Sequence, residues 1–109
     1  MDKVDLNVGD VVVFTYPYEE QKKKWTVQAT SDRFVILTSR GYGAGIIYTI
    51  LDWGREVRGP VNLTGGGYPI KRESLTEDVN HLLDDLHDDL EVSYRNNVPI
   101  KIKEVIRKD

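Results

Sequence analysis

The stretch from Arg33 to Leu63 constrains the fold of this chain most, because it holds two strongly apolar segments around a glycine-rich turn. In segments 34–37 and 46–53, apolar side chains fall on both faces of an extended chain. A strand that is apolar on both faces has to be covered on both. The turn at 40–45 contains three glycines, which allow the positive φ angles of tight turns. The pattern predicts a central antiparallel hairpin followed by a polar loop.

The same glycine-rich turn has letters in common with phosphate-binding loops. A dinucleotide-binding fingerprint must open a helix, whereas this turn leads into a β-branched run. The turn therefore does not predict a dinucleotide-binding domain.

Three further segments have the pattern of strands. Residues 11–16 are apolar and end at Pro17, residues 25–30 alternate apolar and polar side chains, and the last strand at 100–103 also alternates. The lysines of 22–24 follow two glutamates, so we interpret them as a solvated hairpin tip rather than a phosphate site. We expect the last strand to return to the sheet edge, where its lysines limit association between edges. Short strands with frequent turns suit a strongly bent sheet, such as an SH3-like half-barrel.

One amphipathic helix is predicted after a connection at 63–73. Ser74 as N-cap and Glu77 three residues later form a capping-box pattern, and the helix is expected to end near Leu90. An apolar stripe consists of Leu75, Val79, Leu82, Leu83, Leu86 and Leu90. The predicted fold is therefore α+β: a small, strongly bent antiparallel sheet, one C-terminal amphipathic helix and a returning strand, in a single domain over 1–109.

Composition narrows the classes of partner. The chain has 109 residues, a net charge of -3 and no cysteine. This balance gives no general reason to expect direct nucleic-acid binding, and it excludes disulfides and thiolate chemistry. No apolar run reaches the roughly 20 residues that span a bilayer, and the N-terminus lacks a signal core. We expect a soluble cytoplasmic protein without a membrane partner.

The sequence shows no arrangement typical of catalysis. Both histidines, His81 and His87, lie among acidic residues on the polar side of the predicted helix. Their spacing of six residues differs from the i, i+4 pair of a helical zinc site. We therefore predict no enzyme activity, no metal and no cofactor, and we interpret the acidic side as a solvated surface.

Two polar segments form the candidate ligand site. One follows the central hairpin and the other follows the helix. Their members are Trp53, Arg55, Arg58, Gly59, Asn62, Tyr94, Arg95 and Asn96. Arginine, asparagine and backbone amides suit phosphates, and aromatic rings stack on bases. The alternative is structural: Arg58 and Asn62 would fix a Gly-Pro turn, and Arg95 would pair with the acidic helix.

Four segments resemble a family of small phage and prophage proteins, over about the later two-thirds of the chain. They are Arg33-Phe34-Val35-Ile36, Tyr48-Thr49-Ile50-Leu51-Asp52, Val57-Arg58-Gly59-Pro60-Val61-Asn62-Leu63 and Glu91-Val92-Ser93-Tyr94-Arg95-Asn96-Asn97-Val98-Pro99. Among phage proteins of this size, the chain is similar to the anti-Thoeris sponges, which bind a cyclised ADP-ribose signal without cleaving it. The resemblance implies an oligomeric, non-enzymatic trap for a nucleotide immune signal.

Two other functions fit the same residues. The acidic helix would suit an inhibitor of a host defence nuclease that imitates DNA, of the anti-CRISPR or anti-restriction kind. A phage accessory module that binds a protein partner is the other alternative.

Because one helix covers one face of the sheet, either the first two strands or a second subunit must cover the other face. We expect a homodimer or higher oligomer.

Overall fold

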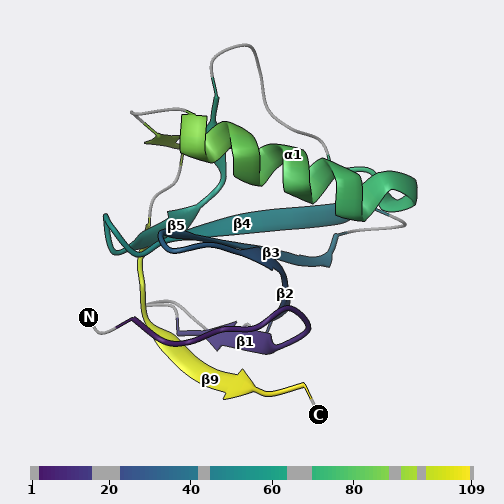
Figure 1. Ribbon diagram of the computed structural model, residues 1–109. Helices are drawn as coiled ribbons and strands as arrows, with labels where there is room; N and C mark the ends of the chain where they lie inside the picture. The colour runs from purple at the N-terminus through teal and green to yellow at the C-terminus, as the bar shows by residue number, and fades with distance from the viewer. Residues whose placement is uncertain are drawn as a thin grey trace.

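The computed structural model describes residues 3–15, 23–41, 45–63, 70–88, 92–95 and 98–108, and its fold is α+β (Figure 1). A curled antiparallel sheet of seven strands has the order β8-β5-β4-β3-β2-β1-β9. The strands of this sheet are β1 (Val11–Phe14), β2 (Lys24–Thr30), β3 (Phe34–Arg40), β4 (Ile46–Asp52), β5 (Val57–Gly59), β8 (Val98–Pro99) and β9 (Ile102–Ile106). A separate pair is formed by β6 (Val61–Asn62) and β7 (Ser93–Tyr94).

The predicted central hairpin is confirmed. Strands β3 and β4 pair in one unbroken register, from Phe34 opposite Asp52 to Arg40 opposite Ile46. The apolar residues alternate between the two faces, so Phe34 and Ile36 face one core and Val35 faces the other. The hairpin therefore forms the central layer of the molecule.

Helix α1 (Leu75–Asp88) covers one face of this layer (Figure 1). The predicted stripe is confirmed, because Val79, Leu82 and Leu86 are buried in the same core as Ile36 and Ile50. The predicted capping box named Glu77 as the partner of Ser74, and this partner is wrong. Ser74 ends the 3-10 turn η1 (Arg72–Ser74), and its hydroxyl lies 2.7 Å from a carboxylate oxygen of Asp78 rather than Glu77. That carboxylate also accepts the Lys71 amide at 3.0 Å, so it holds the entry to the helix. Leu90 lies outside the described residues.

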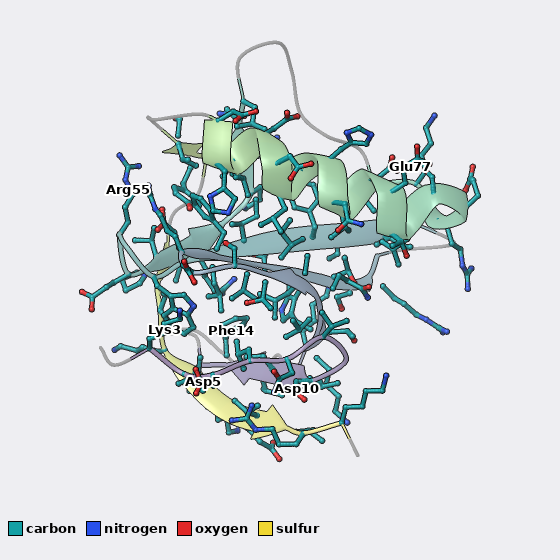
Figure 2. All side chains as sticks on the ribbon, viewed as in Figure 1. Lys3, Asp5, Asp10, Phe14, Arg55 and Glu77 are labelled. Atoms are coloured by element: carbon teal, nitrogen blue, oxygen red, sulfur yellow. The ribbon has the colours of Figure 1, made fainter. Side chains whose placement is uncertain are left out.

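The curled sheet itself covers the other face. In Figure 1, β1 and β9 lie on the side of β3 and β4 opposite α1, and Figure 2 shows Phe14 between these two layers. The second core consists of Leu6, Val12, Phe14, Trp25, Val27, Val35, Leu37, Leu51 and Ile100. Of the two predicted covers, the chain's own strands are the one found. Self-association stays a prediction. An uncovered sheet face is no longer an argument for it, because the chain's own strands cover that face.

A buried carboxylate fastens the last strand. Strand β9 pairs with β1 at the sheet edge, as predicted. Asp10, the residue before β1, is 2% exposed. Its carboxylate accepts hydrogen bonds from the two residues after β9, namely the Lys108 amide at 2.9 Å and the Arg107 guanidinium at 3.0 Å. Arg107 also donates to the Asp5 carbonyl. The hydrogen bonds from the Lys108 and Asn7 amides lower the pKa of Asp10.

The sequence did not predict the short strands that follow the hairpin. Residues 57–62 were expected to form a polar loop, but β5 extends the main sheet next to β4 and β6 pairs with β7. The segment after the helix splits between the two sheets, with β7 in the small pair and β8 beside β5. This arrangement brings the chain after Trp53 and the chain after the helix together. Most of the predicted connection at 63–73 lies outside the described residues.

Candidate functional site

The two predicted ligand loops meet around one buried carboxylate, in a cluster we call the junction (Arg33, Asp52, Gly54, Arg55, Val92 and Tyr94). Asp52 is fully buried, and the Arg33 guanidinium donates one hydrogen bond to each of its carboxylate oxygens, both at 2.9 Å. The same carboxylate accepts the Tyr94 hydroxyl at 2.9 Å and the amides of Gly54 and Arg55 at 2.9 and 3.2 Å. Five donors therefore saturate it.

These contacts set the charge state of the junction. Burial alone would raise the pKa of Asp52, but the hydrogen bonds from Arg33 and Tyr94 outweigh it, and the pKa is lowered. The bond to Asp52 raises the pKa of Arg33. Burial and the neighbouring carboxylate raise the pKa of Tyr94 well above its usual range. At neutral pH, Asp52 and Arg33 therefore form an ion pair, and the Tyr94 phenol beside them is neutral. Such an arrangement stabilises the fold.

Two predicted site residues reach solvent at this end of the molecule, Arg55 in the junction and Arg95 next to it. The exposed Arg55 lies at the end of the molecule opposite Glu77 (Figure 2), and its Nη1 donates to the Val92 carbonyl at 2.5 Å. Arg95 is also exposed; its amide donates to the Pro60 carbonyl at 3.0 Å, and its positive charge acts to lower the pKa of Tyr48, which burial raises. Among the described residues, Arg95 forms no ion pair with the acidic helix, so this pairing of the structural alternative is not found. Trp53 is half-buried against the second core.

The other predicted site residues lie elsewhere. Arg58 is 5% exposed, and its guanidinium carbon lies 4.5 Å from the centre of the Phe14 ring. Gly59 is buried with φ at 151°, a conformation that favours glycine. Asn62 is exposed on β6, opposite Ser93, and Asn96 lies outside the described residues. The locations of Arg58 and Gly59 therefore suit packing and backbone geometry rather than contact with a ligand.

A basic groove of about 700 Å³ lies at the opposite end of β3 and β4. It forms because the sheet face that α1 covers changes from apolar to polar side chains where it extends past the helix. Along β3, Phe34 and Ile36 contact the helix core, whereas Thr38 and Arg40, which follow them on the same face, line the groove. The lining consists of Lys24, Thr26, Thr38, Ser39, Arg40, Gly45, Ile46, Arg72 and Leu75. These residues come from β2, β3, β4 and the start of the helix.

Three cations face this groove. Thr26 lies opposite Thr38 across β2 and β3, and continuing that register by two residues brings Lys24 beside Arg40. The Ser39 hydroxyl donates to the Lys24 carbonyl at 2.9 Å, which fixes the two strands at this point. Arg72 is the third cation, from the turn before α1. Within the described parts of the chain, none of the three forms an ion pair and no carboxylate lines the groove.

Like charges directly opposite each other on neighbouring strands destabilise a sheet. An anion between Lys24 and Arg40 would remove that cost. The groove therefore has the charge and the concave shape of an anion-binding site.

Sequence reasoning missed this groove because its cations are dispersed. We assigned Lys24 to a solvated tip, Arg40 to a turn and Arg72 to a connection, and only strand pairing brings them together. One signal was present. Lys24 and Thr26 alternate with the apolar Trp25 and Val27, and Thr38 and Arg40 continue the alternation of β3. Pairing these two polar stripes would have pointed to the groove.

The acidic side of α1 is exposed, as predicted. Glu77, Asp84 and Asp88 face solvent together with His81, while the His87 ring packs edge-on against Phe34 at 5.3 Å. No cluster of residues suited to a metal ion occurs in the described ranges. Among the same residues, no helix is long and apolar enough to cross a membrane.

Comparison with known proteins found no matching family model, no matching curated protein and no matching solved structure. The function is therefore inferred from the geometry of the junction and the groove. The junction has its polar groups satisfied by one another, whereas the groove gathers cations that have no described counter-ion.

Proposed function

We propose that this protein is a non-enzymatic binding protein that holds a small phosphorylated nucleotide in the basic groove. The observation that carries the proposal is the convergence of Lys24, Arg40 and Arg72 on one concave surface between hydroxyl groups. Arginine and lysine bind phosphate oxygens through charge-assisted hydrogen bonds, and threonine hydroxyls add neutral donors. A volume of about 700 Å³ falls within the range of small-ligand sites.

The chemistry of the lining favours binding over catalysis. Among its described residues, none carries a carboxylate, an imidazole or a thiol. A general base or a nucleophile activated by a base would need such a group within hydrogen-bonding reach. We therefore assign retention of the ligand, not its conversion.

The biological role that we propose is sequestration of a nucleotide immune signal. The resemblance to the phage anti-Thoeris sponges supports a ligand of the cyclised ADP-ribose type, which carries a pyrophosphate. In this proposal the phosphates lie in the basic groove, rather than at the junction that the sequence indicated. The protein then acts in the cytoplasm of the infected cell by lowering the free concentration of the signal.

Titration calorimetry with cyclic ADP-ribose isomers tests both the class of ligand and the location of the binding site. We expect Arg40→Ala to weaken binding by roughly 1.5–3 kcal/mol, the range for hydrogen bonds to charged groups, or about 10- to 150-fold. Arg95→Ala is the matched control, because it removes the same charge from the exposed surface of the opposite end. We expect its affinity to equal that of the wild type.

Three other results would contradict the proposal. If the wild type binds none of these nucleotides, a trap for this signal is ruled out. If Arg95→Ala loses affinity and Arg40→Ala does not, the ligand lies next to the junction and not in the groove. If a single-stranded oligonucleotide binds far more tightly than any isomer, the groove serves nucleic acid instead.

The exposed acidic side of α1 keeps a second function open to test, namely inhibition of a defence nuclease by imitation of DNA. Asp84→Ala combined with Asp88→Ala should abolish such inhibition and leave nucleotide binding unchanged, because both side chains are exposed and lie outside the groove.

A further inference from the structure

We infer that the basic groove selects its ligand by a pair of adjacent phosphates and is nearly indifferent to the nucleobase. This inference rests on the proposed function and specifies which part of a nucleotide the groove recognises. It applies to diphosphate-bearing ligands as a chemical class, whether the pyrophosphate is terminal or joins two sugars.

The arrangement of charge is the first support. Lys24 and Arg40 lie side by side on neighbouring strands, while Arg72 approaches from the turn before α1. A diphosphate brings two or three negative charges in one compact group and can contact cations on both walls. A single phosphate that satisfies the strand pair leaves the charge of Arg72 uncompensated. The number of phosphates should therefore dominate the affinity.

The hydroxyl groups at the base of the groove are the second support. Thr38 lines the groove although only 5% of its surface is exposed, so it belongs to the floor. In the described part of the structure, its hydroxyl makes no hydrogen bond, and Thr26 lies opposite it. A hydroxyl on the floor of the groove can donate a hydrogen bond to a ligand oxygen. Two adjacent threonines thus offer donors between the cations, where the oxygens of a diphosphate would lie.

The apolar part of the lining is the third support. Ile46 and Leu75 are aliphatic, and no aromatic ring is among the described lining residues. Base stacking on an aromatic ring contributes roughly 1–3 kcal/mol, and it is the usual means of holding a base without reading its edges. The three cations of the described lining therefore supply most of the affinity, through the phosphates. We therefore expect adenine and guanine nucleotides to bind alike.

A calorimetric series with ADP, GDP, AMP and inorganic pyrophosphate tests the inference. We expect ADP and GDP to agree within about threefold, AMP to bind at least tenfold more weakly than ADP, and pyrophosphate to compete with ADP, because the phosphate pair supplies most of the binding energy. Lys24→Gln should weaken ADP at least tenfold and reduce the difference between ADP and AMP.

Lys23→Gln is the matched control, because the adjacent Lys23 points away from the groove, with its amine 5.6 Å from the centre of the Trp25 ring. We expect this variant to bind ADP as the wild type does. Equal loss in both lysine variants would show a general charge effect and overturn the assignment of Lys24.

The two levels of the proposal fail separately. If no nucleotide in either series binds, the proposed function fails and the inference fails with it. If cyclic ADP-ribose isomers bind but ADP does not, or if AMP equals ADP, or if ADP and GDP differ by more than tenfold, only recognition of the phosphate pair is overturned.

A second readout requires no nucleotide affinity at all. At equal ionic strength, pyrophosphate should raise the melting temperature of the wild type above its value in chloride, because it binds the folded state. Arg40→Gln should remove most of this increase. No difference between the two anions for the wild type would contradict the inference.

Discussion

Replacing Asp52 with alanine is expected to destabilise the fold by about 3 kcal/mol, the lower end of the roughly 3–5 kcal/mol range for breaking a buried ion pair. The carboxylate is fully buried and accepts bonds from two side chains and two amides. Without it, the Tyr94 hydroxyl and both amides lose their acceptor. The lower end applies because the Arg33 side chain is 39% exposed and can turn to water. Chemical denaturation at pH 7 measures the loss.

Asp32→Ala is the matched control, because this aspartate is exposed at the turn before β3. Its effect should stay within about 0.5 kcal/mol. Equal losses in the two variants would contradict the role assigned to the junction.

The pH dependence gives the same test a second readout. The pKa of Asp52 is lowered in the folded state, so its stabilising contribution is complete above the unfolded pKa of about 3.9. The contribution is lost as the pH falls from about 4 toward the folded pKa. The stability difference between the wild type and Asp52→Asn should therefore shrink between pH 7 and pH 3. Asp10 titrates in the same direction but is present in both proteins, so it cancels from this difference.

Leu86→Ala should cost roughly 2–5 kcal/mol, because it leaves a cavity in the core between α1 and the central hairpin. Leu86 is 1% exposed and lies in the same apolar cluster as Phe34 and Ile36. Thermal melts compared with the wild type measure the loss. Asp88→Ala, two residues further along the helix, is the control, since Asp88 is exposed. A neutral Leu86→Ala or a matching loss in Asp88→Ala would contradict the orientation of the helix.

The periodic parts of the sequence predicted the fold well. The hairpin, the apolar stripe of α1 and the returning last strand all have strong alternation or helical spacing, and all three are present. Short strands such as β5 and β6 carry too few residues for a period to show. The Asp78 contact at the start of the helix was missed because Ser74 offers the same pattern with Glu77.

The candidate site was harder to predict, because residue type does not reveal which polar groups are satisfied internally. The sequence correctly indicated that the chain after Trp53 and the chain after the helix share a polar cluster. It did not indicate that Asp52 would take up Arg33 and Tyr94, or that Arg58 would lie against Phe14. The basic groove depends on the pairing of β2 with β3, and register between distant strands is not written in either strand alone.

The central claim is that a phosphorylated ligand occupies the basic groove, and backbone amide shifts recorded by NMR during a titration with ADP test it most directly. The account predicts saturable changes at residues 24–26, 38–41, 45–46 and 72–75, with little change at 53–59 and 92–95. Changes confined to 53–59 and 92–95, or no saturable change up to millimolar ADP, would contradict it.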